Sequence, residues 1–160
     1  MQPLSVLPDP ERPAQLSAEA SSGLRVHANS DVGRKILLVD DDTTFQEIMK
    51  DFLIETGYDV VAVQNGVEGV HEVLASDFEV ILCDMMMPTL PGDMFFRAVE
   101  RMRPHLCSRF VFMTGHRGNQ KVNDFIQLVS GTILNKPFKV DDLLEMIAFI
   151  QVRMAVQKAA

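Results

Sequence analysis

Acidic residues follow one apolar segment of this chain. The apolar run at 36–39 leads directly into three aspartates, Asp40, Asp41 and Asp42. Asp is ordinary where a strand ends and a helix is capped, so this stretch alone leaves a structural and a chemical role open. Three adjacent like charges repel one another, however, and the end of a buried strand compensates them poorly. We therefore expect a cation at this point.

Three further polar residues interrupt apolar segments later in the chain. Asp84 follows EVILC, Thr114 follows RFVFM, and Lys136 follows TILN. Carboxylates suit Mg²⁺, which keeps several waters and often shares its coordination shell with phosphate. A lysine and a hydroxyl complement phosphoryl oxygens, and an aspartate can itself become an aspartyl phosphate. The set predicts a shared metal and phosphate site, provided that the fold brings these residues together.

The elements that must position these residues alternate along the chain. Short apolar segments are each followed by a segment with apolar residues at helical spacing, and Thr44 and Glu47 form a candidate capping box. We expect strands at 36–39, 59–63, 79–83, 109–113 and 132–135 and helices at 44–56, 67–74, 93–102, 122–129 and 143–154. Five such units predict a doubly wound α/β fold, (βα)5, with a parallel sheet of order 2-1-3-4-5 and helices on both faces. In that order the carboxyl ends of strands 1 and 3 are neighbours, which is where ligands bind.

Composition limits the classes of function. The chain has 160 residues, 47% of them hydrophobic, and a net charge of −7. This length favours a single domain, and the acidic balance argues against binding of nucleic acid or an anionic membrane. No segment approaches 18 consecutive apolar residues, and the N-terminus does not resemble a signal peptide. We expect a cytoplasmic protein in which Cys83 and Cys107 are reduced.

The domain organisation follows from a change in composition. Residues 1–33 are rich in Pro and Ser and predict a disordered tail or linker. We expect the folded domain at 34–155 and the end of the last helix, or a short tail, at 156–160.

The segments ILLVDDD, ILCDMMMP, FVFMTG and NKPF, in this order, resemble the receiver domain of two-component response regulators. The resemblance covers residues 34–155 and implies the flavodoxin-like fold of that family. It implies that Asp84 is the phosphoacceptor and that Lys136 and Thr114 contact phosphoryl oxygens. It further implies Mg²⁺, with Mn²⁺ as a substitute, held by Asp40, Asp41, Asp84 and the backbone carbonyl of Met86. Asp42 would lie outside the metal shell, Gly115 would leave the site open, and a cis bond is expected before Pro137.

The resemblance also implies a role in signalling. The phosphoryl donor would be a histidine kinase or a histidine phosphotransfer protein, and the phosphorylated form would control a downstream protein target. We expect a phosphorelay switch rather than a turnover enzyme, with phosphorylation-dependent homodimerisation left open. The chain would be a stand-alone receiver or the receiver of a hybrid histidine kinase.

Three positions depart from the family pattern or tune it. Ile133 stands where the family often has a Tyr or Phe that rotates on activation. Met86 and His116 occupy the two positions that tune the lifetime of the phosphoryl group. Because an apolar Met cannot orient an attacking water, we expect slower self-hydrolysis than in a Met86→Asn variant.

Two alternative functions remain open at this point. Asp40-x-Asp42-x-Thr44 also matches the opening motif of haloacid-dehalogenase-like phosphatases, in which Asp40 would be the nucleophile, although this leaves Asp84 unexplained. A pseudo-receiver that no longer accepts phosphate would be a binding module. Its sequence mark would be the loss of Asp84, of an acidic-pair residue or of Lys136, and all of these are present.

Overall fold

A parallel β-sheet forms the centre of the protein in the computed structural model, which describes residues 34–115 and 118–160. The strand order is β2-β1-β3-β4-β5, as predicted. The strands are β1 (Lys35–Val39), β2 (Asp59–Val63), β3 (Val80–Asp84), β4 (Phe110–Thr114) and β5 (Thr132–Asn135). The predicted tail at 1–33 and His116 lie outside the described residues.

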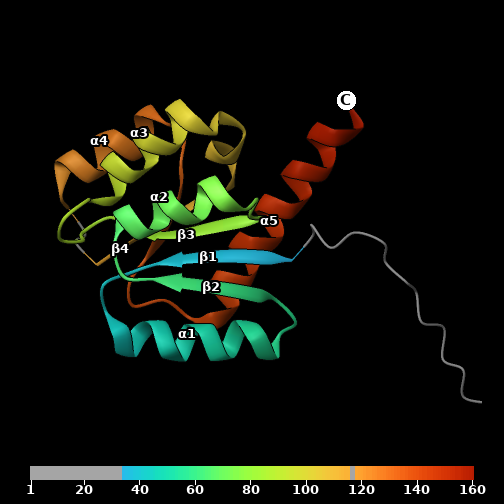
Figure 1. Cartoon of the computed structure of the whole chain (residues 1–160), viewed down its shortest axis with the longest axis horizontal. Coiled ribbons are helices and arrows are strands. Elements are labelled where there is room, and N and C mark those ends of the chain that lie inside the picture. The colour runs from blue at the N-terminus through green and yellow to red at the C-terminus, as the bar shows by residue number, and fades with distance from the viewer. Residues whose placement is uncertain (1–33, 116–117) are drawn as a thin grey trace, which may run out of the picture.

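Helices cover both faces of this sheet (Figure 1). They are α1 (Thr43–Glu55), α2 (Gly66–Ala75), α3 (Gly92–Met102), α4 (Gln120–Leu128) and α5 (Val140–Ala159), with a short 3₁₀ helix, η1 (Pro104–Arg109), before β4. Helices α2, α3 and α4 contribute to one hydrophobic core, and α1 and α5 contribute to a second. The doubly wound prediction is therefore confirmed. No helix among the described residues is long and apolar enough to cross a bilayer.

Strand β1 shows why the apolar runs are continuous. Leu37 and Val39 point into the core under α2, α3 and α4, whereas Ile36 and Leu38 point into the core under α1 and α5. All four residues are fully buried. Because side chains alternate between the faces of a strand, a sheet covered on both sides requires apolar residues at every position.

The start of α1 differs from the prediction. The helix begins at Thr43, and Asp42 caps it by accepting a hydrogen bond from the Phe45 N–H at 3.0 Å. The proposed Thr44/Glu47 capping box is therefore wrong. Apolar spacing over this helix predicts that Ile48 lies on its buried side, yet Ile48 is 60% exposed whereas Gln46 is only 7% exposed. The polar side chain of Gln46 lies inward because it bonds to strand carbonyls, as described below.

Candidate metal and phosphoryl site

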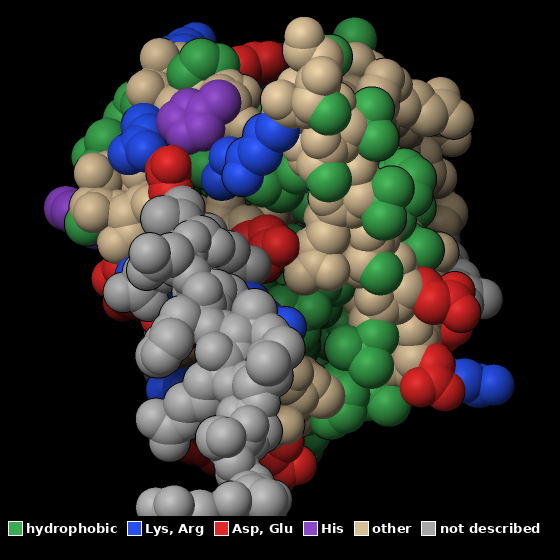
Figure 2. Space-filling view, turned by 90° about the vertical axis from the view of Figure 1, so that its right-hand side faces the viewer, with side chains coloured by type: hydrophobic (Ala, Val, Ile, Leu, Met, Phe, Trp, Pro, Cys, Tyr) green, Lys and Arg blue, Asp and Glu red, His purple; other side chains and the backbone are tan. Residues whose placement is uncertain are grey.

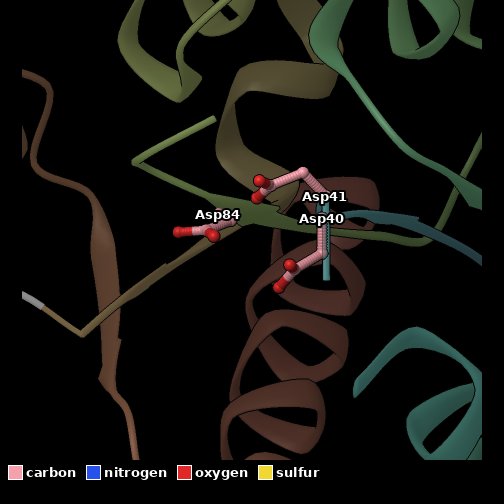
Figure 3. A group of neighbouring side chains, drawn as sticks. All are labelled: Asp40, Asp41 and Asp84. Atoms are coloured by element: carbon pink, nitrogen blue, oxygen red, sulfur yellow. The ribbon is translucent and has the colours of Figure 1, made fainter. Parts of the chain in front are cut away.

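Three carboxylates meet at the carboxyl edge of the sheet. Asp40 and Asp41 directly follow β1, and Asp84 ends the neighbouring strand β3. One carboxylate oxygen from each lies within 4.8 Å of the other two, and the side chains converge (Figure 3). Asp40 is fully buried and Asp84 is 8% exposed, whereas Asp41 is exposed. Oxygen donors at this spacing suit a small, hard divalent cation with open positions for water.

Among the residues that the structure describes, one lysine faces these carboxylates. Lys136 Nζ lies 2.5 Å from Asp40 Oδ2 and 3.5 Å from Asp84 Oδ2. The same ammonium lies 4.2 Å from the centre of the Phe45 ring, whose edge packs against Phe138. One positive charge against three negative charges leaves a deficit that a divalent cation would compensate. The ring over the ammonium limits its freedom of movement.

Burial controls the acidity of Asp84. Removal from water raises the pKa of this carboxyl, whereas Lys136 and the N–H of Met86 lower it, and the charges of Asp40 and Asp41 raise it further; the net direction is upward. The Met86 N–H donates to Asp84 Oδ1 at 3.1 Å. A cation at the site would therefore favour the ionised, nucleophilic form of Asp84.

Gln46 supports the metal-facing residues, and sequence reasoning missed it. Its Nε2 donates to the backbone carbonyl of Asp40 at 2.9 Å and to the carbonyl of Val63. The Asp40 carbonyl directly follows β1 and the Val63 carbonyl belongs to the last residue of β2. The Gln46 side chain therefore fixes the ends of these two strands against each other. The only signal in the sequence is that Gln46, Met49 and Leu53 share the spacing of one helix face.

Thr114 and Lys136 come from adjacent strand ends. Thr114, which ends β4 and is 2% exposed, pairs in register with Asn135, and its carbonyl accepts a hydrogen bond from the Lys136 N–H at 2.8 Å. Among the described residues, a Cβ added at Gly115 would meet nothing closer than the Lys136 Cβ, at 4.0 Å, so the space beside the site is open there, as predicted. The Lys136–Pro137 bond is cis, which confirms the expectation.

The loop after β3 completes the edge. Met86 is 45% exposed, whereas its neighbours Met85 and Met87 are buried and pack in the core. Gly92 allows the following helix to approach, because a Cβ there would lie 2.5 Å from the Asp84 carbonyl oxygen. The loop is thus held against the phosphoacceptor candidate, with the backbone of residue 86 beside it.

Ile133 does not reach this edge. It is partly buried and packs against the core that contains Phe96, Phe112 and Phe125. These rings contact one another, with centroids 5.5–5.6 Å apart. The core beside α4 is therefore built from aromatic groups of α3, β4 and α4, together with Ile133 of β5.

Comparisons with known proteins agree with this geometry. The family model for the response regulator receiver domain matches residues 36–148. The chain is 26% identical over 117 residues to the chemotaxis protein CheY of Bacillus subtilis, covering 72% of this chain and 96% of that protein. It is 30% identical over 115 residues to the response regulator protein FleR of Pseudomonas aeruginosa, covering 71% of this chain but 24% of FleR.

Several of these relatives are longer proteins, since the chain spans only between 23% and 51% of the length of the first three curated relatives. Among solved structures, the receiver domain of the sensor histidine kinase PA1611 from Pseudomonas aeruginosa is 25% identical, with a TM-score of 0.66. The match covers 74% of this chain and 98% of that one, which has a magnesium ion coordinated in its active-site cleft. On the strength of the family model, the strand order and these relatives, the chain belongs to the response regulator receiver domain family of two-component systems.

Proposed function

We propose that this protein accepts a phosphoryl group on Asp84 from a phosphohistidine. The observation that carries the proposal is the convergence of Asp40, Asp41 and Asp84 around a site that Lys136 faces. A carboxylate oxygen of Asp84 would attack phosphorus, the P–N bond would break, and the imidazole would leave with a proton from solvent. Asp84 is buried enough to be positioned yet exposed enough to be reached.

The residues of this chain would hold Mg²⁺, or Mn²⁺ in its place, through Asp40, Asp41, Asp84 and the backbone carbonyl of Met86. The bound cation would neutralise charge on the phosphoryl oxygens. This donor set consists of hard oxygen atoms, which fits the metal. The proposal extends to this chain the magnesium site that lies in the active-site cleft of the PA1611 receiver structure.

Lys136 and Thr114 would contact the incoming group. Lys136 Nζ already lies 3.5 Å from Asp84 and would exchange part of its contact with Asp40 for a phosphoryl oxygen. Thr114 lies on the neighbouring strand end and would donate its hydroxyl to another oxygen. Because Thr114 continues the strand that carries Phe112, a shift of this strand end would reach the rings of Phe96 and Phe125 on α3 and α4. With Ile133 in place of the usual aromatic residue, this packed ring cluster is the proposed route of the switch.

The donor in this proposal is a histidine kinase or a histidine phosphotransfer protein, and the readout is contact with a downstream protein target. The protein would act in the cytoplasm as a signalling switch, either free-standing or as part of a longer chain. Phosphorylation could also change its self-association. Met86, whose thioether cannot orient a water molecule, favours a long-lived phosphoryl group.

Labelling with a small phosphodonor tests the proposal. Wild-type protein incubated with acetyl phosphate and Mg²⁺ should gain one phosphoryl group, located on Asp84 by mass spectrometry of borohydride-reduced peptides. The Asp84→Asn variant should gain none, whereas Asp42→Asn, which keeps a capping side chain, should be labelled normally. Label on Asp40 would instead support the phosphatase alternative, and no label with Mg²⁺ bound would support the pseudo-receiver; either result contradicts the proposal.

A further inference from the structure

Basic side chains gather at the edge of the sheet opposite the carboxylates. The strands point to the left in Figure 1, so Figure 2 shows the edge where they begin. On this face Lys, Arg and His side chains lie close together, with acidic side chains beside them. A pocket of about 250 Å³ lies here between η1 and the end of α5. Its lining consists of Pro104, His105, Ser108, Arg109, Met154, Gln157 and Lys158.

The charge of this lining is one-sided. His105, Arg109 and Lys158 can each carry a positive charge, and no carboxylate is among the lining residues that the structure describes. Outside the lining, Asp77 pairs with Arg103 and forms a hydrogen bond of 3.2 Å with His105. Asp77 is thus shared by Arg103 and His105, whereas Arg109 and Lys158 form no ion pair among the described residues. In a chain with a net charge of −7, a pocket of this sign is a local exception.

Arg109 keeps hydrogen-bonding capacity for a ligand. Its Nη1 donates to the Phe78 carbonyl at 2.5 Å, and the structure gives its guanidinium no further hydrogen bond among the described residues. Burial lowers the pKa of Arg109, whereas Asp77 and Glu79 raise it, yet a guanidinium remains charged under ordinary conditions. The remaining N–H groups can form the paired contacts that suit phosphate.

A second acid, Glu79, lies at this edge. Glu79 precedes β3, and one of its carboxylate oxygens is buried with no hydrogen-bond partner among the described residues. Burial raises the pKa of this carboxyl, against the effects of Gln151 and of the nearby cations. Even with Asp77 and Glu79 both ionised, the three cations Arg103, Arg109 and Lys158 outnumber them, so the edge keeps an excess of positive charge beside the pocket.

We propose that this pocket binds the phosphate or diphosphate group of a small molecule. Arg109 would supply a planar pair of donors, Lys158 a flexible charge from the last turn of α5, and His105 and Ser108 a ring nitrogen and a hydroxyl. The volume is below the range of roughly 300–1,000 Å³ for sites that enclose drug-sized ligands, so it fits the anionic group alone. The proposal does not depend on phosphorylation of Asp84, which ends β3 at the other edge.

Titration with inorganic pyrophosphate in metal-free buffer tests this site. In ¹H–¹⁵N spectra of the whole chain, amide signals of residues 105–109 and 154–158 should shift, and those beside the three carboxylates should not. Lys158→Ala and His105→Gln should each weaken binding about three- to tenfold, a typical loss for one charged contact that is partly exposed to solvent. Lys50→Ala, which removes an exposed lysine from α1, should bind as the wild type does.

Two further measurements make the result decisive. Thermal unfolding of each variant should match the wild type, since His105 and Lys158 are exposed, so that weaker binding reports the contact rather than the fold. Citrate should bind more weakly than pyrophosphate. The proposal is overturned if Lys158→Ala and His105→Gln bind as the wild type does, if the shifts follow the carboxylate edge, or if citrate binds equally well at these residues.

Discussion

The two edges of the sheet carry charge of opposite sign in different surroundings. At the carboxyl edge, buried Asp40 and Asp84 share one lysine, and their positions follow from the strands that they end. At the opposite edge, His105 and Lys158 are exposed and come from η1 and the end of α5. Because charges interact more strongly when they are removed from water, the first arrangement suits a covalent reaction and the second suits reversible binding.

Lys136→Ala should have the largest effect, and that effect should be confined to the carboxyl edge. It removes the only cation that the structure places at the three carboxylates within the described residues. Labelling of Asp84 by acetyl phosphate should slow by about 100- to 1,000-fold, the usual loss when one group that stabilises charge in the transition state is removed. Binding of pyrophosphate at the other edge should be unchanged.

The matched control is Lys139→Ala, which removes an exposed lysine three positions further along. It should label at the wild-type rate. A Lys136→Ala protein that is labelled as fast as the control would show that this lysine does not assist phosphoryl transfer.

The carboxyl edge could be predicted from the sequence because its residues interrupt continuous apolar runs. Asp84, Thr114 and Lys136 each stand where a strand pattern stops, and parallel strands bring such positions to one edge. The basic pocket could not be predicted in this way. Arg109 and Lys158 belong to a 3₁₀ helix and a helix end, whose relative positions depend on how α5 packs rather than on strand register.

The sequence pattern also did not predict which side of α1 is buried. Apolar spacing placed Ile48 inside, but the helix turns Gln46 toward the sheet, where its amide bonds to two backbone carbonyls. Hydrophobic periodicity ignores such hydrogen bonds, since it treats a glutamine as a residue for the solvent side. The sequence pattern assigns the N-cap of α1 to Thr44 instead of Asp42, because both residues have side chains that can cap a helix.

Gln46→Leu should have the second-largest effect and tests how the carboxyl edge is held. Leu keeps a similar volume but leaves the carbonyls of Asp40 and Val63 without the amide donor. Since an unpaired buried polar group costs about 1–3 kcal/mol, the free energy of unfolding should fall by about that amount. Urea unfolding in metal-free buffer measures it, and calorimetric titration should show weaker Mg²⁺ binding.

Glu47→Leu is the matched control, because this neighbouring side chain is exposed. Its free energy of unfolding should stay within about 0.5 kcal/mol of the wild type, as is usual for surface positions. If Gln46→Leu lowers stability but binds Mg²⁺ as tightly as the wild type, Gln46 supports the fold without positioning Asp40.

Glu79→Gln should have the smallest effect, and it tests the opposite edge. Burial raises the pKa of the Glu79 carboxyl above its value in the unfolded chain, so the folded protein binds this proton more tightly. The group then contributes stability below its unfolded pKa, and this contribution is lost as pH rises through the folded pKa. A neutral glutamine avoids that loss. The variant should therefore gain stability relative to the wild type between acidic and neutral pH, as measured by urea unfolding at several pH values.

Two comparisons sharpen this last test. Glu47→Gln changes an exposed carboxyl and should show no such pH-dependent gain. Mg²⁺ should leave the gain from Glu79→Gln unchanged, because Glu79 stands before β3 whereas the carboxylates that face Lys136 stand at its other end. A gain that disappeared on adding Mg²⁺ would mean that the two edges are coupled through β3, and the distinction between a reactive edge and an independent binding edge would then be wrong.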